Sequence, residues 1–352
     1  MPDEAGFAAR AAAEPSAQDP QVALPDAAGA ALPAAARPER STRSVLMDLG
    51  EKWATLIGFA LMIAFFWIDS PSTFGTVANF KSILDEAAVP VLLGVGLTAV
   101  LAVAEFDLAF PYSLGLASAA ATLMMTDLHA GAFVAVVVGI VVAVAAGAIS
   151  GLFVAQQRVS SFVITLGFGF VWLGIADGLT KSQVITINNT AFDNLTSHHV
   201  LGFTVATVIA AAFALVIGVM FGWTVLGRYM LSVGSNPQAS RLAGLRLAGL
   251  RVAAYVVLGL GVGIAAIIIT SRQAQYTPDV GAGLFLTPYV AAFFGMSVLA
   301  ARRFNVLGTV IGALFVGTLQ TGLVIIGAAS WVGELLQGAV LLIILLIARR
   351  GS

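Results

Sequence analysis

Ten runs of 16 to 25 mostly apolar residues occupy most of the chain from residue 53 onward, and all but two of the connections between them are short. A helix needs about 17–25 such residues to cross a hydrocarbon core of roughly 30 Å. Open strands cannot satisfy their backbone hydrogen bonds in lipid. We therefore predict an all-α polytopic membrane protein with about ten transmembrane helices, some of them interrupted. The runs are Trp53–Ile68, Ala87–Ala104, Leu108–Met125, Gly131–Ala155, Phe162–Leu179, Phe203–Phe221, Val252–Thr270, Leu284–Leu299, Val306–Ala328 and Trp331–Ala348.

The composition supports this class and excludes others. Only 10% of the residues are charged, whereas a soluble domain carries about a quarter, and the mean hydropathy is +0.98. The net charge of −1 does not suggest a nucleic-acid partner. The absence of cysteine excludes disulfides, thiolate metal sites and cysteine nucleophiles. The three histidines fall in expected loops without metal-ligand spacing, so we expect no metal and no cofactor.

The first 44 residues differ from the rest of the chain. They are rich in alanine, proline and charge, and they lack the basic start and apolar run of a secretory signal. Such a segment buries too little apolar surface to offset the entropy of ordering. We expect residues 1–44 to form a disordered cytoplasmic tail and residues 45–352 to form the transmembrane domain.

Lysine and arginine are distributed unequally over a ten-span arrangement. With the N-terminus inside, 14 of the 17 basic residues face the cytoplasm, and only Lys81, Lys181 and Arg272 lie outside. Because basic loops stay in the cytoplasm, this asymmetry predicts that both termini are cytoplasmic. Two connections are long: a polar outer loop, Thr180–Gly202, and an inner loop, residues 222–251.

A short helix is expected within the inner loop. Asn236 or the serine before it suits the N-cap, and Pro237 suits the first helical position. The helix should run through Leu242 and end near Gly244, a typical C-terminal glycine. A small helix between two spans can contact a cytoplasmic partner, or it can contact lipid headgroups through Arg241.

The inner loop reads G-S-N-P-Q-A-S-R-L-A-G from Gly234 to Gly244, preceded by L-G-R-Y. This G-x-N-x-x-A-x-R-L-x-G pattern resembles the coupling loop of ribose/xylose-type ABC permeases. The resemblance implies that the loop contacts an ATPase through Asn236, Pro237, Ala239, Arg241, Leu242 and Gly244.

Further motifs of this permease family follow in the same order from about Phe80 to the C-terminus. Similar segments are Phe106–Leu108, Gly147–Ala155, Ser161–Gly167, Gly281–Gly283 with Val290–Ala292, and Gly308–Gly317. The chain departs from the family at Ala104–Glu105, Phe110–Tyr112, Ser161 and Phe293–Met296. These departures cluster where the family lines its translocation path, so the transported solute is not fixed by the resemblance.

The resemblance implies the permease subunit of an ABC importer that carries a sugar or sugar-like solute across the bacterial inner membrane. The chain has no Walker A pattern, so we expect it not to be an enzyme. A separate cytoplasmic ABC ATPase would hydrolyse ATP. The other implied partners are a periplasmic solute-binding protein and a second permease copy, identical or homologous, within the lipid bilayer.

Charges in apolar spans are costly and often functional, which singles out Glu105 and Asp107 between the second and third runs. Asp107 is better suited to capping the helix that follows it. Aromatic rings nearby can stack on a sugar ring, or they can serve ordinary packing. The candidate path residues are Glu105, Phe106, Asp107, Tyr112, Phe162, Thr165 and Tyr289.

Two Pro-Tyr pairs occur in runs that cross the membrane in opposite directions. Pro111-Tyr112 follows Asp107, and Pro288-Tyr289 follows Asp279. Similar interruptions in opposite directions are typical of an inverted repeat around a transport path. We hypothesise that Tyr112 and Tyr289 approach the same central pathway.

Other functions remain open at this point. A related ABC permease for nucleosides or branched-chain amino acids fits the same motifs. An ion-coupled secondary transporter could use Glu105 and Asp107 as a relay, but it would need no coupling loop. No nucleophile–base or metal spacing supports an intramembrane enzyme.

Overall fold

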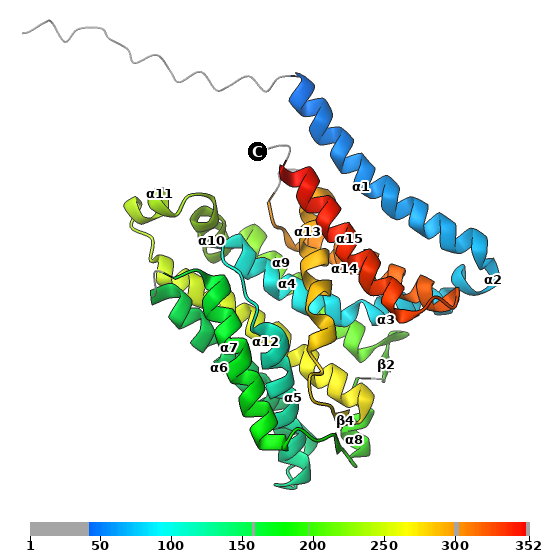
Figure 1. The fold of residues 1–352 in the computed structure, drawn as a ribbon, viewed down its shortest axis with the longest axis vertical. Helices are drawn as coiled ribbons and strands as arrows, with labels where there is room; N and C mark the ends of the chain where they lie inside the picture. Colours follow the sequence, from blue (N-terminus) through cyan, green and yellow to red (C-terminus); the bar gives the residue numbers. More distant parts are fainter. Residues whose placement is uncertain (1–41, 157–158, 197, 299–302, 350–352) are drawn as a thin grey trace, which may run out of the picture. The chain divides into compact units, whose positions relative to one another are not determined.

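The computed structural model describes residues 42–156, 159–196, 198–298 and 303–349. Each of the ten predicted apolar runs coincides with one helix (Figure 1). These helices are α1 (Thr42–Asp69), α4 (Ala88–Ala102), α5 (Phe110–Thr126), α6 (Ala132–Gln156), α7 (Ser161–Thr180), α9 (Val205–Trp223), α12 (Leu247–Gln273), α13 (Leu286–Val298), α14 (Val306–Ile325) and α15 (Ser330–Arg349).

Shorter elements occupy the connections between these helices. They are α2 (Pro71–Phe74), α3 (Val77–Glu86), α8 (Thr190–Asp193), α10 (Val225–Ser235), α11 (Pro237–Leu242) and the 3₁₀ turn η1 (Ala282–Leu284). Two antiparallel ribbons pair β1 (Ile185–Thr186) with β4 (Gln275–Tyr276) and β2 (His199–Val200) with β3 (Phe203–Thr204). Each strand has two residues, so the helical class is unaffected.

Length and apolar composition identify the helices that can cross a membrane on their own. Within the described residues these are α6, α7, α9, α12 and α14, and α3 with α4 forms a sixth span bent by 41°. The same search of the described residues gives three shorter apolar helical segments, Thr55–Asp69, Ala282–Val298 and Ser330–Ile344. The structure thus shows a multi-span helical membrane protein with five or six full-length spans.

The predicted N-terminal tail mostly lies outside the described residues. Helix α1 begins at Thr42, so residues 42–44, which the sequence assigned to the tail, are helical.

Helix α4 forms the centre of the packed bundle. All fifteen of its residues are buried, and it contacts α9, α12, α13 and α14. Its backbone approaches α12 closely: a Cβ at Gly261 would lie 2.6 Å from the Leu92 carbonyl oxygen, and one at Gly96 would lie 3.0 Å from the Leu258 Cα. Since the contact moves forward along α4 and backward along α12, the two helices are antiparallel.

Helices α6 and α12 also pack through small residues. A Cβ at Gly147 would lie 2.6 Å from the carbonyl oxygen of Tyr255, and a Cβ at Gly259 would lie 2.8 Å from that of Ala143. Small residues at i and i+4 allow two helix backbones to touch in lipid, where packing and not water exclusion holds helices together. These contacts fix α12 between α4 and α6.

Candidate translocation path and coupling segment

The chain is irregular between α4 and α5, over residues 103–109, which we call the break. Ala104 has a φ of 59°, in the left-handed region, and Asp107 is buried among the surrounding helices. Backbone donors and acceptors that are buried outside a helix need other hydrogen-bond partners. The donors and acceptors of the break must therefore find partners on neighbouring helices.

Helix α7 provides two hydroxyl acceptors. The Ser161 Oγ accepts the N–H of Phe106 at 3.1 Å, and the Thr165 Oγ1 accepts the N–H of Leu108 at 2.9 Å. Thr165 in turn donates to the carbonyl of Ser161 at 2.7 Å, one turn earlier in its own helix. The hydroxyls of this turn of α7 thus replace the helical carbonyls that the break lacks.

Two tyrosines provide the donors. The Tyr255 hydroxyl of α12 donates to the Phe106 carbonyl at 2.6 Å, and the Tyr289 hydroxyl of α13 donates to the Asp107 carbonyl at 2.6 Å. Tyr255 is 0% exposed and Tyr289 is 6% exposed. Three helices therefore hold the break in one conformation.

Asp107 caps α5. Its Oδ1 accepts the N–H groups of Ala109 at 2.6 Å and Phe110 at 3.1 Å, the first free donors of the helix. A carboxylate at this position also interacts favourably with the helix dipole. The interpretation of Asp107 as a capping residue is confirmed.

Glu105 forms an ion pair with Arg251 near the start of α12. The Glu105 Oε1 lies 2.8 Å from the Arg251 Nε, and the side chains are 12% and 24% exposed. The negative charge of Glu105 is therefore balanced within the protein.

A cavity of about 530 Å³ opens beside the break, and we call it the inner cavity because α10 of the inner loop lines it. Its walls come from the end of α4, from the break, from α10, from α13 and from the segment that leads into α14. The lining residues are Leu101, Ala102, Ala104, Glu105, Phe106, Leu231, Gly234, Ser235, Phe293, Met296, Arg303 and Phe304.

An outer cavity of about 630 Å³ lies between α3, η1, α13, α14 and α15. Two carboxylates, two carboxamides, a serine hydroxyl and an aromatic ring line it, and the lining residues are Glu86, Ala282, Gly283, Phe285, Leu286, Gln320, Leu323, Val324, Ala328, Ala329, Ser330, Gly333, Glu334 and Gln337. Carboxylates and amides bind hydroxyl groups, and an aromatic face packs against apolar C–H surface.

One face of α13 connects the two cavities. Phe285, directly before α13, lines the outer cavity, Phe293 lines the inner one, and Tyr289 lies midway, four positions from each. Residues at this spacing share one helix face. The Tyr289 ring lies 6.1 Å from that of Phe285 and 6.4 Å from that of Phe106. A continuous row of aromatic side chains thus runs from one cavity to the other.

The predicted path residues fall into two groups. Glu105, Phe106, Asp107, Thr165 and Tyr289 come together at the break, and the first two of these line the inner cavity. The remaining two are separate: the Tyr112 ring stacks on Phe170 of α7 at 6.0 Å, and Phe162 is 51% exposed on α7. That these residues line a translocation path stays a prediction.

Sequence analysis missed three residues that hold the break. Tyr255 gave a signal, because a tyrosine inside an apolar run needs a hydrogen-bond partner. Ser161 was noted only as a departure from the family motif, although its hydroxyl binds the break. Arg251 was counted only as a cytoplasmic charge, and nothing in the sequence joins it to Glu105.

The inner loop forms the expected short helix, α11. The Asn236 Oδ1 accepts the N–H of Ala239 at 2.9 Å, Pro237 occupies the first turn, and Gly244 has a φ of 80° just after the helix. Leu242 is 91% exposed at the end of α11. The predicted cap and helix are confirmed, and an apolar side chain projects from the inner loop. The assignment of Asn236, Pro237, Ala239, Arg241, Leu242 and Gly244 to ATPase contact stays a prediction.

Known proteins resemble this chain over most of its length. A family described as "Branched-chain amino acid transport system / permease component" matches residues 79–345. The ribose import permease protein of Escherichia coli K12 is 30% identical over 83% of this chain and 92% of its own length. That of Bacillus subtilis 168 is 27% identical over 86% and 94%, and the D-allose transport system permease protein of E. coli K12 is 26% identical over 83% and 90%. The chain therefore belongs to the family of these membrane transport permease components.

Proposed function

We propose that the chain is the permease subunit of an ABC importer that carries a sugar across the bacterial inner membrane. The observation that carries this proposal is the pair of cavities joined by the aromatic face of α13. The outer cavity presents carboxylates, amides and an aromatic ring, which is the chemistry that binds a polyhydroxylated ring. The sugar permeases among its relatives support the same assignment.

The lining of the outer cavity favours a sugar over a branched-chain amino acid. An amino acid carries a carboxylate that needs a cationic or N–H-rich partner. The charged groups that line this cavity are Glu86 and Glu334, and none of its described lining residues is basic. The two carboxylates can pair with the ammonium group of an amino acid but leave its carboxylate without a cationic partner, whereas neutral hydroxyls donate to them without this cost. The family's description keeps branched-chain amino acids as the second candidate.

The proposed topology has ten spans with both termini in the cytoplasm. Helix α11 lies at one end of the bundle, and α8, β2 and β4 lie at the opposite end (Figure 1). The first turn of α1 and the last turn of α15 point toward the end that carries α11 (Figure 1). A common side for these three segments supports the proposed topology, and their basic residues favour the cytoplasm as that side.

Transport requires partners in this proposal. A cytoplasmic ABC ATPase would engage α11 through Arg241 and the exposed Leu242. A periplasmic binding protein would deliver the sugar and dock on the outer loop, Thr180–Gly202. A second permease copy would complete the transporter, and rigid-body rearrangement of the two copies would open the path to each side in turn.

Reconstitution tests the proposal. Proteoliposomes are prepared with the chain in the membrane, its ATPase in the lumen and its binding protein outside. They should accumulate a radiolabelled pentose or hexose only when the lumen contains ATP. Uptake of leucine in place of all sugars would favour the second candidate. Uptake without the ATPase that collapses on addition of a protonophore would overturn the importer assignment and indicate a secondary transporter.

A further inference from the structure

Two ion pairs in the described part of the chain join the same two segments. Arg251 of α12 pairs with Glu105, three residues after the end of α4. Arg272 of α12 pairs with Asp85 at 2.6 Å, three residues before the start of α4. Because α4 and α12 are antiparallel, each pair fastens one end of α12 to one end of α4.

The distance between the two arginines matches the thickness of a membrane. They are 21 positions apart in one helix, which at 1.5 Å per residue is about 32 Å. The hydrocarbon core is roughly 30 Å thick. In the proposed orientation, the Arg251 pair lies at the cytoplasmic interface and the Arg272 pair at the outer interface.

The inner end of α12 is attached to both the coupling segment and the break. Four residues separate α11 from α12, and Tyr255, one turn after Arg251, donates to the Phe106 carbonyl. Helix α10, which precedes α11 in the chain, contacts the end of α4 directly before the break: a Cβ at Gly234 would lie 2.1 Å from the Ala102 carbonyl oxygen. A movement of α11 therefore acts on α12 and on the break together.

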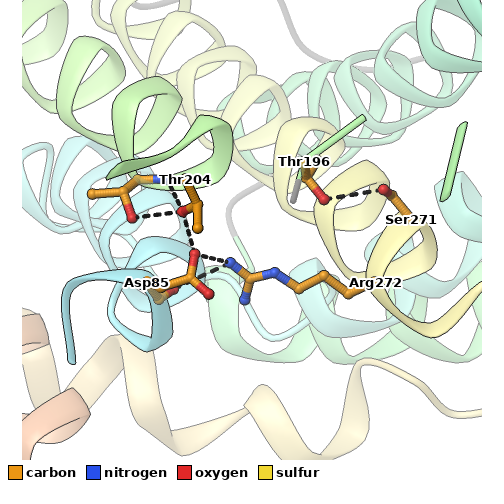
Figure 2. A network of polar contacts seen from close by, with 6 residues as sticks. Asp85, Thr196, Thr204, Ser271 and Arg272 are labelled. Atoms are coloured by element: carbon orange, nitrogen blue, oxygen red, sulfur yellow. Dashed lines mark hydrogen bonds and ion pairs between the residues drawn. The ribbon is translucent and has the colours of Figure 1, made fainter. Parts of the chain in front are cut away.

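The outer end of α12 is attached to the outer loop, as Figure 2 shows. The Ser271 Oγ donates to the Phe192 carbonyl of α8 at 2.8 Å and lies 3.0 Å from the Thr196 hydroxyl. Beside it, Arg272 binds Asp85, which also accepts a hydrogen bond from the hydroxyl of Thr204 at the start of α9 (Figure 2). Two adjacent residues of α12 thus hold the outer loop and the α3–α4 junction.

We propose that α12, fastened to α4 at both interfaces, transmits movement between the coupling segment and the outer loop, with Arg251 and Arg272 as positioning residues. At the glycine-mediated contacts, the backbones of α4 and α12 lie too close for one helix to move independently of the other. Closely packed elements of this kind shift as units. A displacement of α11 by an ATPase then moves the outer loop, and a receptor bound to the outer loop moves α11, because coupling is reciprocal.

The ion pairs suit this role better than a role in stability. Their side chains are between 12% and 31% exposed, and partly exposed pairs add little to the free energy of unfolding. Their geometry instead sets which turn of α12 meets which end of α4. Removal of one charge should leave the protein folded and disturb the communication between the two faces.

The inference rests on the proposed function, so the test uses the permease assembled with its ATPase and binding protein. The chain has no cysteine, so Asn194→Cys on the outer loop gives one labelling position. In this parent, trapping the ATPase with ATP and vanadate should change the rate of thiol labelling, and binding protein should stimulate ATP hydrolysis. Arg272→Gln should reduce both responses by about fivefold or more at unchanged basal ATPase activity.

The charge-swapped protein Asp85→Arg/Arg272→Asp should recover most of both responses, which a general loss of structure would not allow. Asp127→Asn, which removes a charge from the α5–α6 connection on the same side of the membrane, is the matched control and should respond like the parent. Equal responses in Arg272→Gln and the parent would overturn the inference. A parent that shows neither ATPase stimulation nor sugar uptake would instead refute the proposed function.

Discussion

The hydroxyl of Tyr289 donates a hydrogen bond of 2.6 Å to the backbone carbonyl of Asp107, 182 residues earlier in the chain. This bond satisfies a carbonyl that no helix uses, because Asp107 lies in the break between α4 and α5. It also places the Tyr289 ring between the outer and inner cavities, beside Phe285 and Phe106. One side chain therefore supports the irregular backbone and lies on the aromatic face that joins the cavities.

Replacing Tyr289 with phenylalanine should weaken the break without removing the ring. The Asp107 carbonyl would lose its donor in a buried site, which costs about 1–3 kcal/mol. We expect a lower thermal unfolding temperature in detergent and reduced sugar uptake in proteoliposomes. Tyr229→Phe on α10 is the control, because that side chain is 43% exposed and its hydroxyl can bind water. Equal unfolding temperatures for both variants would contradict the role assigned to Tyr289.

The contact between α6 and α12 gives a prediction about packing. In Gly147→Ala the new methyl group would meet the Tyr255 carbonyl oxygen at 2.6 Å, so the helices must separate. Overpacking of this kind costs about 1–3 kcal/mol. Gly167→Ala on α7 adds the same methyl group where no atom lies within 4 Å, and the better helix propensity of alanine should keep or raise stability. Thermal unfolding of the two purified variants in detergent measures the difference, and a loss as large at Gly167 would refute the packing argument.

Much of the secondary structure could be predicted from the sequence because apolar length reports directly on burial in lipid. Each of the ten apolar runs is one helix, and the N-cap at Asn236 and the glycine after α11 follow from local chemistry. The bend between α3 and α4 and the short ribbons of the outer loop were not predicted. They depend on contacts between distant residues, such as the pairing of Ile185 with Tyr276.

The candidate site could be predicted only in part, for the same reason. Glu105 and Asp107 attract attention as charges in an apolar region, and the cap formed by Asp107 is local. The sequence does not identify the long-range partners of the break. Arg251 resembles the other basic residues of the cytoplasmic loops, and Ser161 is seen only as a departure from the family motif. A tyrosine in a buried helix signals that a hydrogen bond exists but not which carbonyl accepts it.

The proposed topology predicts opposite labelling of two loops. The chain lacks cysteine, so single Arg241→Cys and Asn194→Cys variants report one position each. Positively charged loops remain in the cytoplasm, so Cys at 241 should resist a membrane-impermeant thiol reagent added outside spheroplasts. Cys at 194 should react, and permeabilisation should make both accessible. External labelling at position 241 of intact spheroplasts would refute the ten-span arrangement.

The exposed Leu242 leads to the last prediction. Leu242 is 91% exposed at the end of α11, and the coupling-loop motif places it where the ATPase would bind. Leu242→Asp should therefore leave the permease folded and inserted but reduce its co-purification with the ATPase, because a buried apolar contact contributes about 1.5–3 kcal/mol, or roughly tenfold or more in affinity. Leu201→Asp on the outer loop, where leucine is 93% exposed, is the matched control and should retain the ATPase. If Leu242→Asp retains the ATPase as fully as Leu201→Asp and supports the same uptake, α11 does not dock through this side chain.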